Sequence, residues 1–270
     1  MIRSLCVVFF SLLVISPGCL TTSTSDSTAD FRLATTTSMR DSGLLDLLIE
    51  DFEQRHDIEV EYVAVGTGAA LHLGENGDVD ALIVHAPQQE EDFLDAGHGT
   101  DRTQIAWNAF VLLSPTPLSS NLSEAFLSVI EEEHCFVSRG DNSGTHMKEQ
   151  DIWRELAERA NITLVEDVNG LHPVGDWYYS IGQGMGATIN MAHEKGCVTL
   201  SDRGTALQFQ SSISLDRYEY NASAVFNPYS FISVNGGNEI IAQTFLEYLL
   251  NDGRSIIENY TINGESPFFV

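Results

Sequence analysis

The chain has 270 residues, of which 43% are apolar, so it can form one large domain or two lobes with packed cores and is not a disordered chain. Its 39 acidic residues outnumber 13 basic ones, for a formal charge of -26, which argues against nucleic acid as a partner because phosphate backbones need clustered cations. Only Lys148 and Lys195 are lysines, and this acidic, lysine-poor composition predicts a halophilic, salt-adapted surface.

The first 19 residues have the pattern of a signal peptide that ends in a lipobox. Arg3 gives a positive start, and the segment 5–15 is apolar apart from one serine and too short to span a membrane. Gly18-Cys19 resembles the end of a lipobox, so we expect a lipid anchor at Cys19. Because Ser16 stands where an aliphatic residue is usual, plain cleavage and an uncleaved anchor stay open. The polar residues 20–30 predict a flexible tether.

The folded body alternates strand-like and helix-like segments. Periodicity and turn residues predict strands at 31–34, 58–65, 79–84 and 105–114, and helices at 42–55, 68–73 and 88–94. A second round predicts helices at 124–133, 144–159 and 239–250, a largely helical segment at 177–195, strands at 136–138, 198–200 and 229–234, and an interruption at Asn227-Pro228. This order predicts an α/β protein whose sheets are mainly parallel and flanked by helices.

Two such rounds joined by long apolar strands predict two lobes with two hinge crossovers, near 110–114 and 224–230. We assign residues 31–112 and 228–270 to lobe I, and residues 113–227 to lobe II. Sheets of this kind bind small ligands at the carboxyl ends of their strands. The cleft between the lobes is therefore the expected site.

Cys135 and Cys197 each begin a short apolar run that leads into a turn. The sequence leaves open whether they form a disulfide, because connectivity does not follow from spacing. No C-x-x-C or H-x-x-x-H spacing accompanies them, so we expect no metal site. Glycosylation motifs occur at Asn121, Asn161, Asn221 and Asn259.

Hydroxyls, glycines and free backbone N–H groups recur just after the predicted strands. They lie at 35–38, at 66–68, beside His85, and in the stretch SRGDNSGTH at 138–146. A helix N-terminus attracts anions because its first N–H groups lack partners and its dipole is positive there. Arg139 adds a planar fork suited to two oxygens of a tetrahedral anion. Together these features predict an oxyanion site, although each hydroxyl alone also fits a helix cap and Arg139 beside Asp141 also fits an ion pair.

The chain resembles the tungstate-binding proteins of ABC importers, a group within the type II periplasmic-binding-protein fold. The matching stretches are ATTTSMRDSGLLD at 34–46, VAVGTGAALHLGENGDVDALIVHAP at 63–87, FVSRGDNSGTHMKE at 136–149, GQGMGATINMAHEKG at 182–196, TLSDRGTAL at 199–207 and NPYSFISVN at 227–235.

The resemblance implies an extracytoplasmic monomer, anchored to the outer face of the cell membrane, that captures tungstate or molybdate between its lobes and delivers it to an ABC permease. It implies no catalysis, cofactor or metal. The anion-binding residues that it implies are Thr36, Thr37, Ser38, Thr67, Arg139, Ser143, Gly144 and Thr145. Related phosphate binders carry, where His85 stands, an aspartate that accepts the proton of hydrogen phosphate, whereas a proton-free anion needs donors only.

Three alternatives stay open at this point. The first is a binder of another oxyanion: molybdate, sulfate or phosphate. The second is a secreted hydrolase that uses Ser143 with His146, for which the sequence offers no third group to orient the pair. The third is a sensor domain that feeds a signalling partner.

Overall fold

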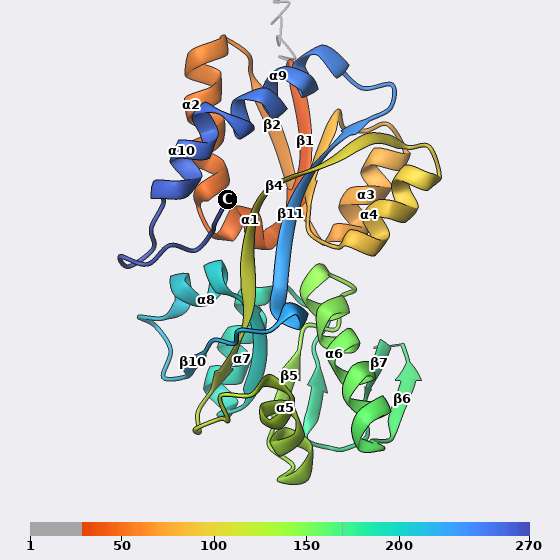
Figure 1. Cartoon of the computed structure of the whole chain (residues 1–270), viewed down its shortest axis with the longest axis vertical. Coiled ribbons are helices and arrows are strands. Elements are labelled where there is room, and N and C mark those ends of the chain that lie inside the picture. Colours follow the sequence, from red (N-terminus) through yellow and green to blue (C-terminus); the bar gives the residue numbers. More distant parts are fainter. Residues whose placement is uncertain (1–28, 169) are drawn as a thin grey trace, which may run out of the picture.

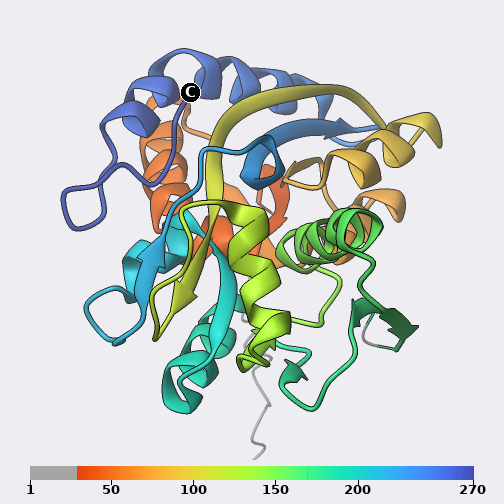
Figure 2. The same ribbon diagram turned by 60° about the horizontal axis from the view of Figure 1, so that its bottom comes forward.

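Two long strands, β4 (Gly99–Ser114) and β11 (Phe226–Val234), run side by side through the middle of the molecule. The computed structural model describes residues 29–168 and 170–270, so the predicted signal peptide, the Cys19 anchor and most of the tether lie outside the described residues. The two strands pair antiparallel from Phe226 opposite Ala109 to Val234 opposite Gly99. In Figures 1 and 2 they connect two halves, called here the upper and the lower half after their places in Figure 1.

The upper half is built from both ends of the described chain. Its strands are β1 (Phe31–Thr36), β2 (Val60–Val65) and β3 (Ala81–Val84). β1 pairs parallel with both β2 and β3, and β3 pairs antiparallel with β11. The helices are α1 (Thr37–Asp41), α2 (Leu44–His56), α3 (Thr67–Glu75), α4 (Pro87–Asp95), α9 (Glu239–Leu250) and α10 (Asp252–Asn259).

The lower half continues the same sheet in the order β4-β9-β5-β8. Its strands are β5 (Phe136–Ser138), β8 (Tyr178–Ser180), β9 (Val198–Asp202) and β10 (Asp216–Tyr218), with a separate hairpin of β6 (Leu164–Asp167) and β7 (Gly170–Pro173). Its helices are α5 (Leu122–Glu131), α6 (Gly144–Ala160), α7 (Met185–Lys195), α8 (Arg203–Phe209) and the short 3-10 turn η1 (Ser223–Val225). β5 pairs parallel with β8 and β9, whereas β4 pairs antiparallel with β9 and β10.

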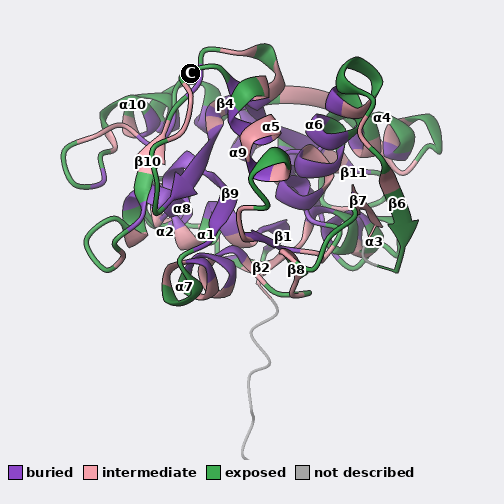
Figure 3. Cartoon of the chain, turned by 90° about the horizontal axis from the view of Figure 1, so that it is seen from below, coloured by how far each residue is buried: buried purple, intermediate pink, exposed green. Residues whose placement is uncertain are grey.

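Each half has its own apolar core. In the upper half, the apolar stripe of α2 packs with Phe31, Phe245 and Tyr229, and a second cluster lies under α3 and α4. In the lower half, Phe126, Phe136 and Trp153 form one cluster, and α7 covers another on the opposite side of β5 and β9. Figure 3 shows the buried residues gathered on the sheet and on the inner faces of the helices. This layering is the α/β architecture that the sequence predicts.

Two predictions about the backbone are wrong. The segment 177–195 is not largely helical: β8 comes first, Gly182 turns with a φ of 63°, and α7 begins only after Gly184. Asn227-Pro228 does not interrupt the chain, because β11 runs through both residues. Pro228 is tolerated there because β3 pairs only with Ser230–Ser233, so this part of β11 has β4 alone as a neighbour.

Cys135 and Cys197 form a disulfide, which settles the pairing that the sequence left open. The bond joins the residues just before β5 and just before β9, two neighbouring parallel strands. The four asparagines of the glycosylation motifs are all exposed. Within the described ranges, no helix combines the length and the apolarity needed to cross a bilayer.

Candidate functional site

The first polar corner follows β1 and forms the start of α1. Thr36 is the N-cap, and its Oγ1 accepts a hydrogen bond from the Met39 amide at 3.4 Å. Thr37 is half-buried as the first residue of the helix. Ser38 is buried, and its Oγ lies 3.1 Å from Thr36 Oγ1. The corner therefore offers helix-start amides, while two of its hydroxyls already have partners.

The second corner lies where β2 turns into α3. Gly66 is the N-cap in extended conformation and has no side chain to cap the helix. Thr67 follows, fully buried, and its Oγ1 has no hydrogen-bond partner among the described residues. A buried hydroxyl without a protein partner costs about 1–3 kcal/mol, and this one lies at a helix N-terminus, so Thr67 is a candidate donor to an anion.

The third corner joins β5 to α6. Ser143 is the N-cap, and its Oγ accepts from the His146 amide at 3.4 Å. Thr145 Oγ1 is the second buried hydroxyl at a helix start without a partner among the described residues. Arg139 is 3% exposed, and its Nη2 lies 2.5 Å from Asp141 Oδ2. The ion pair that the sequence offered as an alternative is thus present, and it orients the guanidinium.

The second and third corners meet between the two halves. A Cβ placed on Gly66 would lie 3.9 Å from the Cα of Ser143. A Cβ placed on Gly144 would lie 2.6 Å from His85 Cε1 and 3.1 Å from the His85 carbonyl oxygen. Only glycine fits at 144, because any side chain there would push α6 away from the upper half. The N-termini of α3 and α6 therefore face each other across the boundary.

A buried polar network fills the space behind these corners. His85 Nδ1 lies 2.9 Å from Asn227 Oδ1, and its Nε2 lies 3.2 Å from Ser38 Oγ. The ring stacks on Tyr229 with centroids 4.7 Å apart, and Asn227 Nδ2 donates to Asn108 Oδ1 at 2.7 Å. Asn108 and Asn227 are directly opposite each other on β4 and β11, so the network anchors the first corner to the crossing strands.

Burial shifts the pKa values of two titratable side chains near Arg139. Burial lowers the pKa of His85 to about 4; the hydrogen bond with Asn227 opposes this shift and the nearby Arg139 charge adds to it. His85 is therefore neutral at neutral pH. Burial raises the pKa of Asp202, while its bonds from Thr205 and the Arg139 charge act the other way. Arg139 thus lies within electrostatic reach of a neutral histidine of the upper half and a buried aspartate of the lower half.

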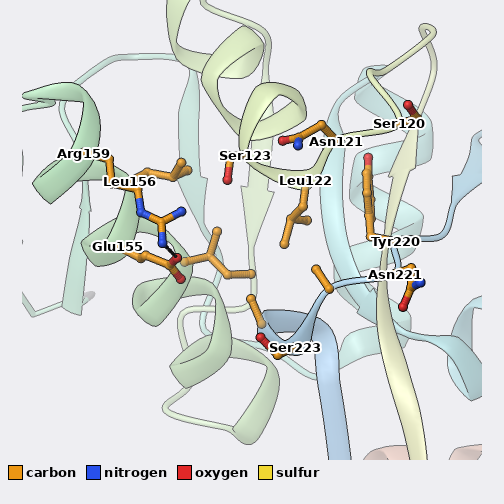
Figure 4. Close-up of a pocket in the computed structure, with 13 residues that line it drawn as sticks. Ser120, Asn121, Leu122, Ser123, Glu155, Leu156, Arg159, Tyr220, Asn221 and Ser223 are labelled. Carbon is orange, nitrogen blue, oxygen red and sulfur yellow. Dashed lines mark ion pairs between the residues drawn. The ribbon is translucent and has the colours of Figure 1, made fainter.

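A groove lies between the two halves beside His85 and Gly144. It has a volume of about 210 Å³ and is lined by the start of α4 and by one face of α6, including His85, Gly144, Lys148 and Arg154. A larger cavity of about 480 Å³ lies elsewhere, beside α5, α6 and η1 (Figure 4). That cavity contains none of the predicted anion-binding residues, and its Arg159 is paired with Glu155 at 2.6 Å. Of the predicted anion-binding residues, the groove is lined by Gly144 alone, at the start of α6.

Sequence reasoning missed four members of the region: Asn108, Asp202, Asn227 and Tyr229. Each is a polar side chain inside or at the end of an apolar strand, and that pattern is the only signal that singles them out before the chain is folded. His85, which lies beside one of the predicted corners, is a buried and hydrogen-bonded side chain. Within the described residues, no group of three or more His, Cys, Asp or Glu side chains is arranged to hold a metal ion.

Two α/β halves joined by paired crossing strands, with donor-rich helix N-termini facing each other between them, define the class of two-lobed solute-binding proteins. The chain belongs to the PBP superfamily, whose domain model matches residues 21–253.

Three relatives illustrate the match. The tungstate-binding protein TupA of Peptoclostridium acidaminophilum is 39% identical over 242 residues, which are 84% of this chain and 80% of that protein. The structure of the tungstate ABC transporter from Geobacter sulfurreducens is 36% identical with a TM-score of 0.72, and the match covers 85% of this chain and 98% of that one. The structure of the tungstate-binding protein TupA from Desulfovibrio alaskensis is 36% identical with a TM-score of 0.71, covering 88% and 97%.

Proposed function

We propose that this protein is the extracytoplasmic component of an ABC importer, and that it captures tungstate between its two halves and delivers the anion to a permease. The observation that carries the proposal is the convergence of α3 and α6, from opposite halves, with Thr67 Oγ1 and Thr145 Oγ1 buried and without partners among the described residues. The names of the relatives point to the same ligand.

The proposed binding residues differ in which hydrogen-bond donors they still have available for an anion. Thr67 and Thr145 offer hydroxyl donors, and the guanidinium of Arg139 offers its charge. The hydroxyls of Thr36 and Ser38 already bond to neighbours, so these residues contribute mainly through position and adjacent amides. Ser143 Oγ accepts from the His146 amide, so its O–H proton stays available as a donor. Thr37 and Gly144 present first-turn N–H groups.

The chemistry of the site favours an anion without a proton. A hydrogen phosphate needs an acceptor for its proton. The two carboxylates that interact with Arg139 already accept hydrogen bonds from the protein: Asp141 from Arg139 and the Ser143 amide, Asp202 from the amide and hydroxyl of Thr205. Tungstate and molybdate require donors alone, so a site built from hydroxyls, amides and a guanidinium favours them over hydrogen phosphate.

Closure of two lobes is the proposed mechanism of capture. We assign residues 31–112 and 228–270 to one lobe and 113–227 to the other; the separate apolar cores support this division except at Phe110, Val111 and Leu112, which pack in the cores of the lower half. The protein acts as a carrier and not as an enzyme. A lipid at Cys19, a monomeric state and adaptation to high salt complete the proposal, supported by the N-terminal motif and the acidic composition.

Titration calorimetry with tungstate, molybdate, sulfate and phosphate at high salt tests the proposal. We expect tight tungstate binding and no measurable phosphate binding. Arg139→Ala should weaken tungstate binding about 100-fold, because two charge-assisted bonds are lost. Arg254→Ala is the matched control, since Arg254 pairs with Glu258 on the outer helix α10. Tight phosphate binding, or equal affinity of wild type and Arg139→Ala, would overturn the proposed site.

A further inference from the structure

The C-terminal segment after α10 leaves the upper half and contacts the lower half. Glu265 Oε2 accepts from Arg203 Nη2 at 2.8 Å and from Arg217 Nη2 at 2.6 Å. Arg203 also donates to the Ser266 carbonyl oxygen. Arg203 begins α8 and Arg217 lies in β10, so both cations belong to the lower half. The contact therefore spans the boundary that the anion site also spans.

A second carboxylate completes an alternating set of charges. Glu219 Oε1 accepts from the Nε atoms of Arg203 and Arg217, at 3.1 and 2.9 Å. The two arginine side chains are only 11% and 15% exposed. The hydrogen bond from Arg217 lowers the pKa of Glu265, so its carboxylate is charged at neutral pH. Networks of partly buried charges of this kind contribute more than isolated surface pairs.

Hydrogen bonds between uncharged groups also join the two halves along the same edge of the molecule. Asn263 Nδ2 donates to the Leu207 carbonyl oxygen at 2.9 Å, and Gln208 Nε2 donates to the Ser42 carbonyl oxygen at 3.0 Å. In Figure 1, α8 lies on the left below the C-terminal segment, whereas α4 and α6, which line the open groove, lie on the right. One edge of the boundary is therefore held by polar contacts, whereas the groove lies at the other edge.

We propose that Arg203, Arg217 and Glu265 form a clasp that sets the anion affinity from a distance by holding the two halves closed. The inference rests on the proposed function. None of the three residues belongs to the helix corners that hold the anion. A ligand that binds only the closed form has its apparent affinity reduced by the fraction of protein that is open. Weakening the clasp therefore weakens anion binding without removing a single ligand contact.

The test compares wild type with Glu265→Gln, which keeps an acceptor but loses the charge. Glu258→Gln is the matched control, because Glu258 pairs with Arg254 inside the one helix α10. Calorimetry and stopped-flow displacement give the Kd and the dissociation rate for tungstate. Small-angle X-ray scattering of the unliganded proteins gives the radius of gyration, which reports opening of the two halves.

For Glu265→Gln we expect a Kd raised about fivefold or more, faster dissociation and a larger unliganded radius of gyration. At saturating tungstate its radius should equal that of wild type, and Glu258→Gln should match wild type throughout. Should Glu265→Gln not fold, Arg217→Gln serves in its place, because it removes the shorter of the two bonds to Glu265.

A lowered melting temperature with unchanged Kd and unchanged scattering would overturn the clasp, because the network would then only stabilise the fold. Failure of the proposed function looks different. If the wild-type protein bound none of the four anions, the site assignment would fall, while scattering of the unliganded variants would still decide whether the clasp holds the halves together.

Discussion

His85 Nε2 lies 3.2 Å from Ser38 Oγ, so a histidine that follows β3 holds a serine that follows β1. Asn227 fixes the tautomer: its Nδ2 donates to Asn108, which leaves its Oδ1 to accept from His85 Nδ1. The lone pair on His85 Nε2 then accepts the proton of the Ser38 hydroxyl. Ser38 therefore donates its hydroxyl proton to the histidine, and the hydroxyl donors left for an anion include those of Thr67 in α3 and Thr145 in α6.

The buried neutral His85 makes stability depend on pH. Its pKa is about 4 in the folded protein, below the roughly 6.5 of an unfolded chain, so the unfolded state binds more protons between these values. The contribution of neutral His85 to the free energy of unfolding is fully present above pH 6.5. It is lost as pH falls toward 4, by up to about 3 kcal/mol. Melting temperatures measured from pH 4.5 to 7.5 should show a slope in wild type that is smaller in His85→Gln. The exposed His72 is the control, and an equal slope in His85→Gln and His72→Gln would contradict the assignment.

Thr67→Val and Thr145→Val separate binding from folding. Neither hydroxyl has a protein partner among the described residues, so the near-isosteric change should leave the melting temperature equal or higher. Each variant should weaken tungstate binding about tenfold, the loss of one hydrogen bond to a charged group. Thr205→Val is the control, because its hydroxyl donates to the buried Asp202 at 2.6 Å and its loss should lower the melting temperature. Unchanged affinity in both Thr67→Val and Thr145→Val would remove these hydroxyls from the site.

The groove between α4 and α6 carries Lys148, one of the two lysines of the chain. A cation in this groove attracts a dianion, although the protein as a whole carries a strongly negative charge. Lys148→Gln should slow tungstate association several-fold at low salt and leave dissociation unchanged. The difference should vanish at 1 M salt, where the Debye length is about 3 Å.

Lys195→Gln is the control for this rate measurement, because Lys195 ends α7 and lies over the Tyr179 ring at 4.8 Å. Stopped-flow association rates at several salt concentrations decide the matter. Equal slowing by both substitutions would mean that the overall charge, and not the groove, guides the anion.

The Cys135–Cys197 bond closes a loop with a sequence separation of 62. By the chain-entropy argument, a loop of this length contributes roughly 4 kcal/mol to stability. Reduction should therefore lower the midpoint of urea unfolding in wild type, while the Cys135→Ala/Cys197→Ala double variant should not respond to the reductant. A wild-type midpoint that ignores reduction would show that the bond adds nothing to stability.

The local sequence pattern was sufficient to predict the bounds of some regular helices and strands. The strand 136–138 and the helix 239–250 were predicted with their observed bounds, and α6 begins at the predicted Gly144. The short α1, β8 and β10 were missed because three to five residues carry too little periodicity to distinguish a helix or strand from a loop. The interruption predicted at Pro228 was wrong, because whether a strand tolerates a proline depends on which neighbouring strands pair with it at that point.

The sequence by itself determined the α/β class, the order of the long elements and the donor-rich corners after the strands, because periodicity and helix-start chemistry are local properties. Only the tertiary structure decided that the α3 and α6 corners meet, that two cysteines join, and that His85 binds Ser38 and Asn227. Ser38 contacts Tyr229 across 191 residues of sequence. No local pattern encodes such a contact, since it depends on how the sheet brings distant strands together and on two crossing strands that set the halves face to face.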